Sequence, residues 1–137
     1  MGMAQINFTS DAIDIGIVTV NDLEMLNFYQ EVLGLKKEME IPFPGLGTVN
    51  KLSFGSGYIK ILVLDDKPKN INPTGNFSTS NGIRYITINL SNLDHILESC
   101  AANNINIINA GTIIRPGVTV AIIQDPDGNL IELMQSE

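Results

Sequence analysis

The chain has 137 residues, 44% of them apolar, which is enough for one domain, or two small fused modules, with a hydrophobic core. Its net charge is −7 and it has no basic cluster, so nucleic acid and anionic membranes are not expected as partners. No run approaches the roughly 18 consecutive apolar residues of a membrane span. The first ten residues lack the basic start and apolar run of a signal peptide, and Cys100 is the single cysteine. We therefore expect a cytoplasmic protein without an internal disulfide.

A strand followed by a helix opens the patterned part of the chain. Residues 13–20 form a short run rich in β-branched side chains, which is typical of a strand. Asn21 and Glu24 have the spacing of a capping box and predict a helix start. Apolar residues then recur every three or four positions as far as Leu33, and Gly34 stands where a helix commonly ends.

Further strands and irregular segments complete the first half. Residues 41–47 hold two prolines and two glycines, so we expect an irregular segment that is either an ordinary connection or a mobile lid. Strands are expected at residues 49–54 and 58–64. The residues that follow, about 67–82, are rich in proline, glycine, asparagine and serine and are expected to form a linker.

The same order of elements returns in the second half. A strand is expected at residues 83–90, Asn92 has the position of a second helix cap, and that helix ends near Asn103. Residues 125–129 read Asp-Pro-Asp-Gly-Asn and predict a tight turn in which Gly128 takes a positive φ. Apolar runs flank this turn, so it predicts a β-hairpin. The closing strands are expected at residues 105–108, 111–114, 118–123 and 130–134.

The two halves repeat at a nearly constant offset. Asp14 and Tyr85 each precede a helix cap by seven residues, and they are 71 residues apart. Asp14 precedes Lys60 by 46 residues, and Tyr85 precedes Glu132 by 47. Because side chains alternate between the two faces of a strand, these four polar side chains can share one face, and a cleft between the halves would gather them.

These motifs resemble those of the glyoxalase, bleomycin-resistance and dioxygenase group, also called the vicinal oxygen chelate superfamily. The resemblance covers about residues 12–135. Its most specific parts are residues 27–35, Asn-Phe-Tyr-Gln-Glu-Val-Leu-Gly-Leu, and residues 125–132, Asp-Pro-Asp-Gly-Asn-Leu-Ile-Glu. It implies an α+β fold in which a single domain contains two βαβββ modules, at about 12–66 and 83–135. The modules would form a cupped, half-barrel-like mixed sheet with the helices outside.

The resemblance places the family's metal-ligand positions at Asp14, Lys60, Tyr85 and Glu132. Members that use a metal hold it there with histidine, glutamate or glutamine, and only Glu132 keeps a family residue. Lys60 would repel a divalent cation, because an ammonium group has donors and no acceptor. No metal or other cofactor is therefore expected. If a divalent metal does bind, Glu132 and Asp14 are the expected ligands.

Two interpretations of these four residues stay open. In one, Lys60 beside Glu132 is a buried ion pair that only neutralises an abandoned metal site. In the other, all four are catalytic: Glu132, with Asp14, moves a proton, while Lys60 and Tyr85 bind the ligand and stabilise negative charge. Arg115 is either a carboxylate or phosphate anchor that also binds the ligand, or a surface turn residue.

The implied function is a glyoxalase-like enzyme of lyase or isomerase type that acts on a small oxygenated or carboxylate substrate. The alternative is a non-catalytic protein that binds and sequesters a small molecule, as bleomycin-resistance members do. A homodimer is also implied, since cupped sheets of this kind often bury an exposed face or edge against a second copy. His95 faces away from the apolar stripe of its helix and is expected in solvent, and Cys100 is expected to be inert core.

Overall fold

The computed structural model describes residues 2–137 and contains two βαβββ modules, as predicted. The first module has β1 (Ile15–Thr19), α1 (Asp22–Asn27), the π-helical turn η1 (Phe28–Val32), β2 (Lys37–Phe43), β3 (Gly47–Phe54) and β4 (Gly57–Leu64). The second has β5 (Tyr85–Asn89), α2 (Leu93–Ala102), β6 (Ile107–Arg115), β7 (Val118–Gln124) and β8 (Leu130–Ser136). The short 3-10 turn η2 (Phe77–Thr79) lies between the modules.

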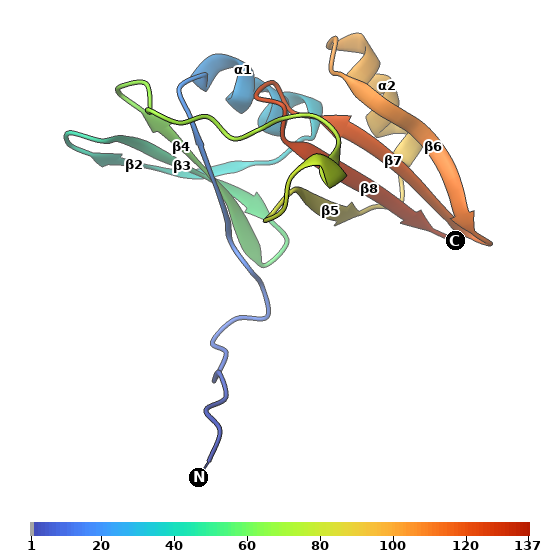
Figure 1. The fold of residues 1–137 in the computed structure, drawn as a ribbon, viewed down its shortest axis with the longest axis horizontal. Coiled ribbons are helices and arrows are strands. Elements are labelled where there is room, and N and C mark those ends of the chain that lie inside the picture. The colour runs from blue at the N-terminus through green and yellow to red at the C-terminus, as the bar shows by residue number, and fades with distance from the viewer. Residues whose placement is uncertain (1) are drawn as a thin grey trace.

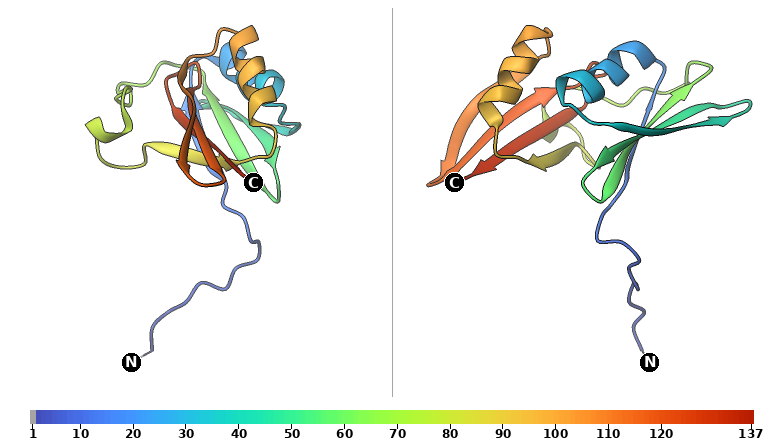
Figure 2. Two further views of the ribbon diagram at one scale, coloured as in Figure 1. Left: turned by 90° about the vertical axis from the view of Figure 1, so that its right-hand side faces the viewer. Right: turned by 180° about the vertical axis from the view of Figure 1, so that it is seen from behind.

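Each module folds into its own four-stranded mixed sheet. The strand orders are β1-β4-β3-β2 and β5-β8-β7-β6, so the first strand of each module pairs in parallel with the last. The helices α1 and α2 lie along the same side of the sheets, and neither lies on the opposite side, which we call the open face (Figure 1 and Figure 2). The sheets do not close into a barrel. This confirms the α+β fold of paired modules with the helices outside.

The pairing register of the first sheet is repeated in the second. Ile15 of β1 lies opposite Ile59 of β4, and Ile86 of β5 lies opposite Ile131 of β8. The offsets are 71 residues for the first strands and 72 for the last, the same offsets that relate the polar positions in the sequence. The four polar residues of interest therefore occupy equivalent places in two equivalent sheets.

One hydrophobic core joins the modules. It lies between the sheets and the helices, because the side chains that alternate toward the helices are the apolar ones. No helix among residues 2–137 is long and apolar enough to cross a membrane. The fully buried members of the core are Met25, Phe28, Tyr29, Leu52, Ile59, Ile61, Cys100, Ala121, Ile123, Ile131 and Leu133.

A buried polar link crosses this core. The Tyr29 hydroxyl, on η1, donates a hydrogen bond of 2.7 Å to Asp125 Oδ2, at the predicted 125–129 turn. Asp125 also accepts hydrogen bonds from the backbone amides of Asp127 and Asn129 and from the Asn129 side chain. Burial raises the pKa of Asp125, although the donors around it partly offset this effect. The two segments that carry the family resemblance are thus in direct contact.

The helix starts differ from the expected capping boxes. Asn21 does not cap α1 with its side chain; its amide donates to Glu24 Oε2 at 3.1 Å instead. Asn92 likewise makes no side-chain cap, and the first amide of α2, that of Leu93, donates to Gln135 Oε1 on β8 at 2.8 Å. A residue distant in sequence has therefore taken over the cap. The first helix also changes to a π-helical turn at Phe28 rather than running as one α-helix to Leu33.

The prediction that residues 41–47 are irregular was wrong for their first part. Pro42 lies within β2, which continues to Phe43 and turns directly into β3. A proline is tolerated here because β2 is at the edge of its sheet, where a missing N–H group costs no ladder hydrogen bond. The segment is the end of a β-hairpin. The two short strands expected within 105–114 also proved to be one irregular strand, β6.

Candidate functional site

On the open face of the first sheet, Lys60 forms an ion pair with Asp14. Lys60 alternates with the buried Ile59 and Ile61 along β4, so it projects to the side away from the helices. Its Nζ lies 3.2 Å from Asp14 Oδ2, and the side chains are each 40% exposed. Asp14 Oδ1 accepts a second hydrogen bond, of 2.9 Å, from the backbone amide of Tyr58. Both carboxylate oxygens of Asp14 are therefore engaged within their own module.

A second lysine lies beside this pair. Lys51 of β3 is directly opposite Lys60 in the strand register, and its Nζ sits 4.1 Å from the centre of the Tyr58 ring. The adjacent ammonium groups repel each other, and the Asp14 carboxylate and the Tyr58 ring offset this repulsion. The hydrogen bond from Lys60 is the main reason that the pKa of Asp14 lies below its ordinary value. Lys51 makes the smallest contribution in the same direction.

We expect Lys60→Gln to raise the pKa of Asp14 back toward its ordinary value of 3.8, measured by NMR titration of the side-chain carboxyl group. A carboxyl group with a lowered folded-state pKa stabilises the fold above its unfolded pKa and loses that contribution as the pH falls through the lower value. The variant should therefore lose less stability than the wild type on acidification below that ordinary value. Lys51→Gln is the control and should shift the pKa less; an equal shift would contradict the assignment.

The second sheet carries its own polar site around Glu132. Glu132 of β8 lies opposite Thr87 of β5, and its Oε1 accepts a hydrogen bond of 2.9 Å from the Thr87 hydroxyl. Tyr85 precedes Thr87 by two residues on the same face, and its ring meets the Phe77 ring edge-on at a centroid distance of 6.0 Å. Glu132, Tyr85 and Phe77 help to line a cavity of about 70 Å³, which we call the Glu132 pocket. Its lining residues are Phe77, Tyr85, Ile122, Leu130 and Glu132.

The four predicted residues thus form two pairs rather than one cluster. Asp14 and Lys60 meet in the first module, and Tyr85 and Glu132 line one pocket in the second. The Lys60–Glu132 ion pair, one of the two interpretations of the sequence, is not formed, because Lys60 bonds Asp14 and Glu132 bonds Thr87. The reason is the topology: each parallel pair of strands places its own partner closest, whereas the other copy of the repeat belongs to a separate sheet.

The donor set at the family's metal positions does not fit a divalent metal. Lys60 puts an ammonium group, which has no acceptor, against the nearest carboxylate, that of Asp14. Asp14 therefore already has a cation as its partner, while Glu132 belongs to the other sheet. Throughout residues 2–137 there is no group of three or more histidine, cysteine, aspartate or glutamate side chains placed to share an ion.

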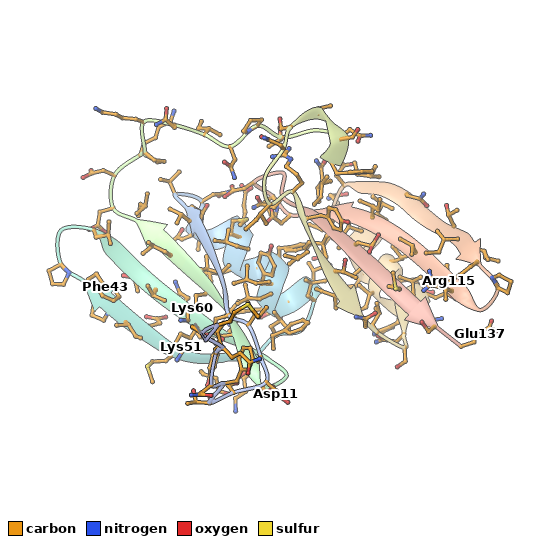
Figure 3. All side chains as sticks on the ribbon, turned by 60° about the horizontal axis from the view of Figure 1, so that its bottom comes forward. Asp11, Phe43, Lys51, Lys60, Arg115 and Glu137 are labelled. Atoms are coloured by element: carbon orange, nitrogen blue, oxygen red, sulfur yellow. The ribbon has the colours of Figure 1, made fainter. Side chains whose placement is uncertain are left out.

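The other side chains considered from the sequence lie away from these two pairs. Arg115 is exposed at the end of β6. Figure 3 shows it at the end of the second module that is farther from Lys60. Its surface-turn interpretation therefore agrees with its position. His95 is exposed on α2. Cys100 is completely buried, and burial raises the pKa of its thiol, as expected of an inert core cysteine.

Two residues of the Glu132 pocket region were missed in the sequence. Thr87 had a usable signal, since it lies two positions after Tyr85 on a strand and must share its face. Phe77 had none, because it falls in the segment expected to be a featureless linker. The short turn η2 brings it back against Tyr85.

Comparisons with known proteins agree with this architecture. Residues 8–133 match the model of the Glyoxalase/Bleomycin resistance protein/Dioxygenase superfamily. No curated protein matches the chain. A glyoxalase family protein from Bacillus cereus is similar in structure, with a TM-score of 0.80, 14% identity, and coverage of 98% of this chain and 99% of that one.

Two more solved structures illustrate the range of similar folds. A glyoxalase family protein from Enterococcus faecalis has a TM-score of 0.69 and 22% identity, and the match covers 89% of this chain and 93% of that one. The trypanothione-dependent glyoxalase I of Leishmania major has a TM-score of 0.66 and 20% identity, with 89% and 84% covered. At these identities the structures establish the fold, while the family model spans most of the chain. The chain belongs to the glyoxalase/bleomycin resistance protein/dioxygenase superfamily.

Proposed function

We propose that the protein binds a small organic molecule in the Glu132 pocket. The composition of the pocket carries this proposal: one carboxylate and one phenol, those of Glu132 and Tyr85, stand among otherwise apolar walls. Apolar walls with a few placed polar groups are usual in small-molecule sites. The fitting ligand places a compact apolar or aromatic part against the apolar walls and presents a cationic or other hydrogen-bond-donating group to Glu132.

The placement of Lys60 supports binding ahead of catalysis. Proton transfer next to a carbonyl group needs a base and also a group that stabilises the negative charge formed on oxygen. Lys60 was the expected stabilising group, but it is paired with Asp14 in the first sheet. Among the side chains that line the pocket with Glu132, the Tyr85 hydroxyl is the one hydrogen-bond donor. Sequestration of a ligand therefore requires fewer polar groups in the pocket than catalysis would.

Binding is testable with benzylamine and its uncharged analogue benzyl alcohol. We expect benzylamine to raise the melting temperature of the wild type more than benzyl alcohol does. Glu132→Gln should weaken benzylamine binding about tenfold or more, because it removes a charge-assisted hydrogen bond. Glu98→Gln is the matched control, since it removes the same charge from an exposed position on α2. Equal losses in both variants would mean that the net charge of the protein, and not the pocket, attracts the amine.

A second candidate, an isomerase or lyase acting next to a carbonyl group, is supported by how Glu132 is held. Thr87 bonds one carboxylate oxygen, which fixes the side chain at the pocket wall. In this candidate Glu132 takes a proton from the carbon next to a carbonyl group, the Tyr85 hydroxyl donates a hydrogen bond to the enolate oxygen, and the proton is then returned to carbon.

Catalysis of this kind is distinguished from binding by isotope exchange. Hydroxyacetone would be incubated with the protein in heavy water, and deuterium incorporation next to the carbonyl group followed by proton NMR. Catalysis predicts exchange that Glu132→Gln abolishes and Glu98→Gln retains. Exchange no faster than in buffer would remove the proton-transfer candidate for this probe while the benzylamine result still decides the binding proposal.

A further inference from the structure

A cavity lies between the two modules. It has a volume of about 580 Å³ and is bounded by the facing strands β1 and β5 and by linker residues 67–75, apart from 69. Figure 1 shows the linker crossing from one module to the other in front of β1. Among their lining residues, this cavity and the Glu132 pocket have only Tyr85 and Leu130 in common. We call it the intermodule cavity.

Two contacts hold the linker over the intermodule cavity. The Arg84 guanidinium donates a hydrogen bond of 2.9 Å from Nη2 to the backbone oxygen of Pro73. Thr74 packs so closely on Gly128 that a Cβ atom added to this glycine would lie 2.6 Å from Thr74 Cγ2. The linker is thereby attached to the start of β5 and to the 125–129 turn. These contacts give the cavity a defined wall on the linker side.

Arg84 has a buried donor without a protein partner. Its Nε atom is shielded from solvent, and no hydrogen bond to it is found within residues 2–137. A buried polar group without a partner is rare and is commonly explained by an ion or water that completes the site. Arg84 lines the intermodule cavity, so a group bound there can accept hydrogen bonds from guanidinium nitrogens other than the shielded Nε. Guanidinium groups match the geometry of carboxylates and phosphates.

The charge of the cavity lining and the two edge strands beside it favour an anionic ligand. Its lining includes the cations Lys67 and Arg84 and one anionic side chain, Asp127, so it is net positive in a chain of net charge −7. Both β1 and β5 lie at the edge of their sheets, and an edge strand presents unpaired N–H groups on its outer side. These backbone groups add donors to those of Arg84. Asn70, Asn72 and Thr74 supply further neutral polar groups.

We propose that the intermodule cavity is a second binding site, which takes a small molecule bearing a carboxylate or phosphate group, with Arg84 as its anchor. Glu132 is not among the residues that line this cavity, so its carboxylate is not part of the wall around the bound anion. Occupation of the site joins the linker, β5 and the 125–129 turn, all of which contribute to its lining.

The test uses the fact that the chain contains only two arginines, Arg84 and Arg115. The Nε–H signals of both are followed by nitrogen-15 NMR while inorganic phosphate or succinate is added to the wild type at constant ionic strength. We expect a saturable shift of the Arg84 signal and little change in that of Arg115, which is exposed on β6. The probe that saturates at the lower concentration identifies phosphate or carboxylate as the preferred group.

Variants decide whether the response belongs to the cavity. Arg84→Gln should weaken binding of the preferred probe by about tenfold or more, measured by calorimetry, because a charge-assisted hydrogen bond is lost. Arg115→Gln changes the net charge equally and should bind as the wild type does. Glu132→Gln should also retain binding, which separates this site from the Glu132 pocket. An unsaturable response to both probes, or equal shifts of both arginines, would overturn the proposal and leave water as the partner of Nε.

Discussion

Replacing Asp125 with alanine is expected to lower the free energy of unfolding by about 3 kcal/mol, because buried groups lose a charged hydrogen-bond acceptor. Asp125 is 3% exposed and accepts from four donors. The variant leaves the Tyr29 hydroxyl buried without its partner and releases the backbone of the 125–129 turn. Urea unfolding measures the change. A loss below about 0.5 kcal/mol, the usual range of a neutral surface substitution, would contradict the role assigned to Asp125.

A double-mutant cycle separates the two tasks of Asp125. Tyr29→Phe removes only the hydrogen bond from Tyr29 to Asp125 and should cost about 1 kcal/mol, as single hydrogen bonds do. The double variant should lose less stability than the sum of the two single losses, since the Tyr29 hydroxyl is no longer left unpaired. If the losses simply add, the Tyr29–Asp125 contact does not stabilise the fold and Asp125 acts only within its turn.

Gly128→Ala is expected to destabilise the protein by about 2 kcal/mol or more, through two separate effects. Gly128 has a φ of 91°, a conformation that costs energy for any residue with a Cβ atom. The new Cβ atom would also lie 2.6 Å from Thr74 Cγ2, so the linker must move away from the turn. Thermal or urea unfolding gives the total loss.

Matched variants divide that loss into its two parts. Gly45 has a similar φ of 81°, and a Cβ atom added there meets nothing within 4 Å, so Gly45→Ala measures the backbone effect alone. Thr74→Gly in the background of Gly128→Ala removes the side chain in contact and should restore stability only in part. A Gly128→Ala loss no greater than that of Gly45→Ala would show that the linker does not depend on its contact with the turn.

The sequence by itself determined the secondary structure of most of the chain and its duplication. The local or repeated signals are the period-two alternation in the strands, the glycines at positions 34 and 128, and the nearly constant offset between the halves. The structure contains each of them. Pro42 misled the prediction, because its effect depends on whether a strand is at the edge or the centre of a sheet. That position is a property of the whole sheet and not of the neighbouring residues.

The tertiary structure alone decided which side chains meet. Alternation placed Asp14, Lys60, Tyr85 and Glu132 on the open face, but alternation alone does not determine which side chains come within hydrogen-bonding distance of one another. The strand pairing did so, joining Lys60 to Asp14 and Glu132 to Thr87. The intermodule cavity is of the same kind, since its walls come from strands and a linker far apart in the chain. Contacts of this sort arise from the packing of distant segments, for which no short sequence pattern exists.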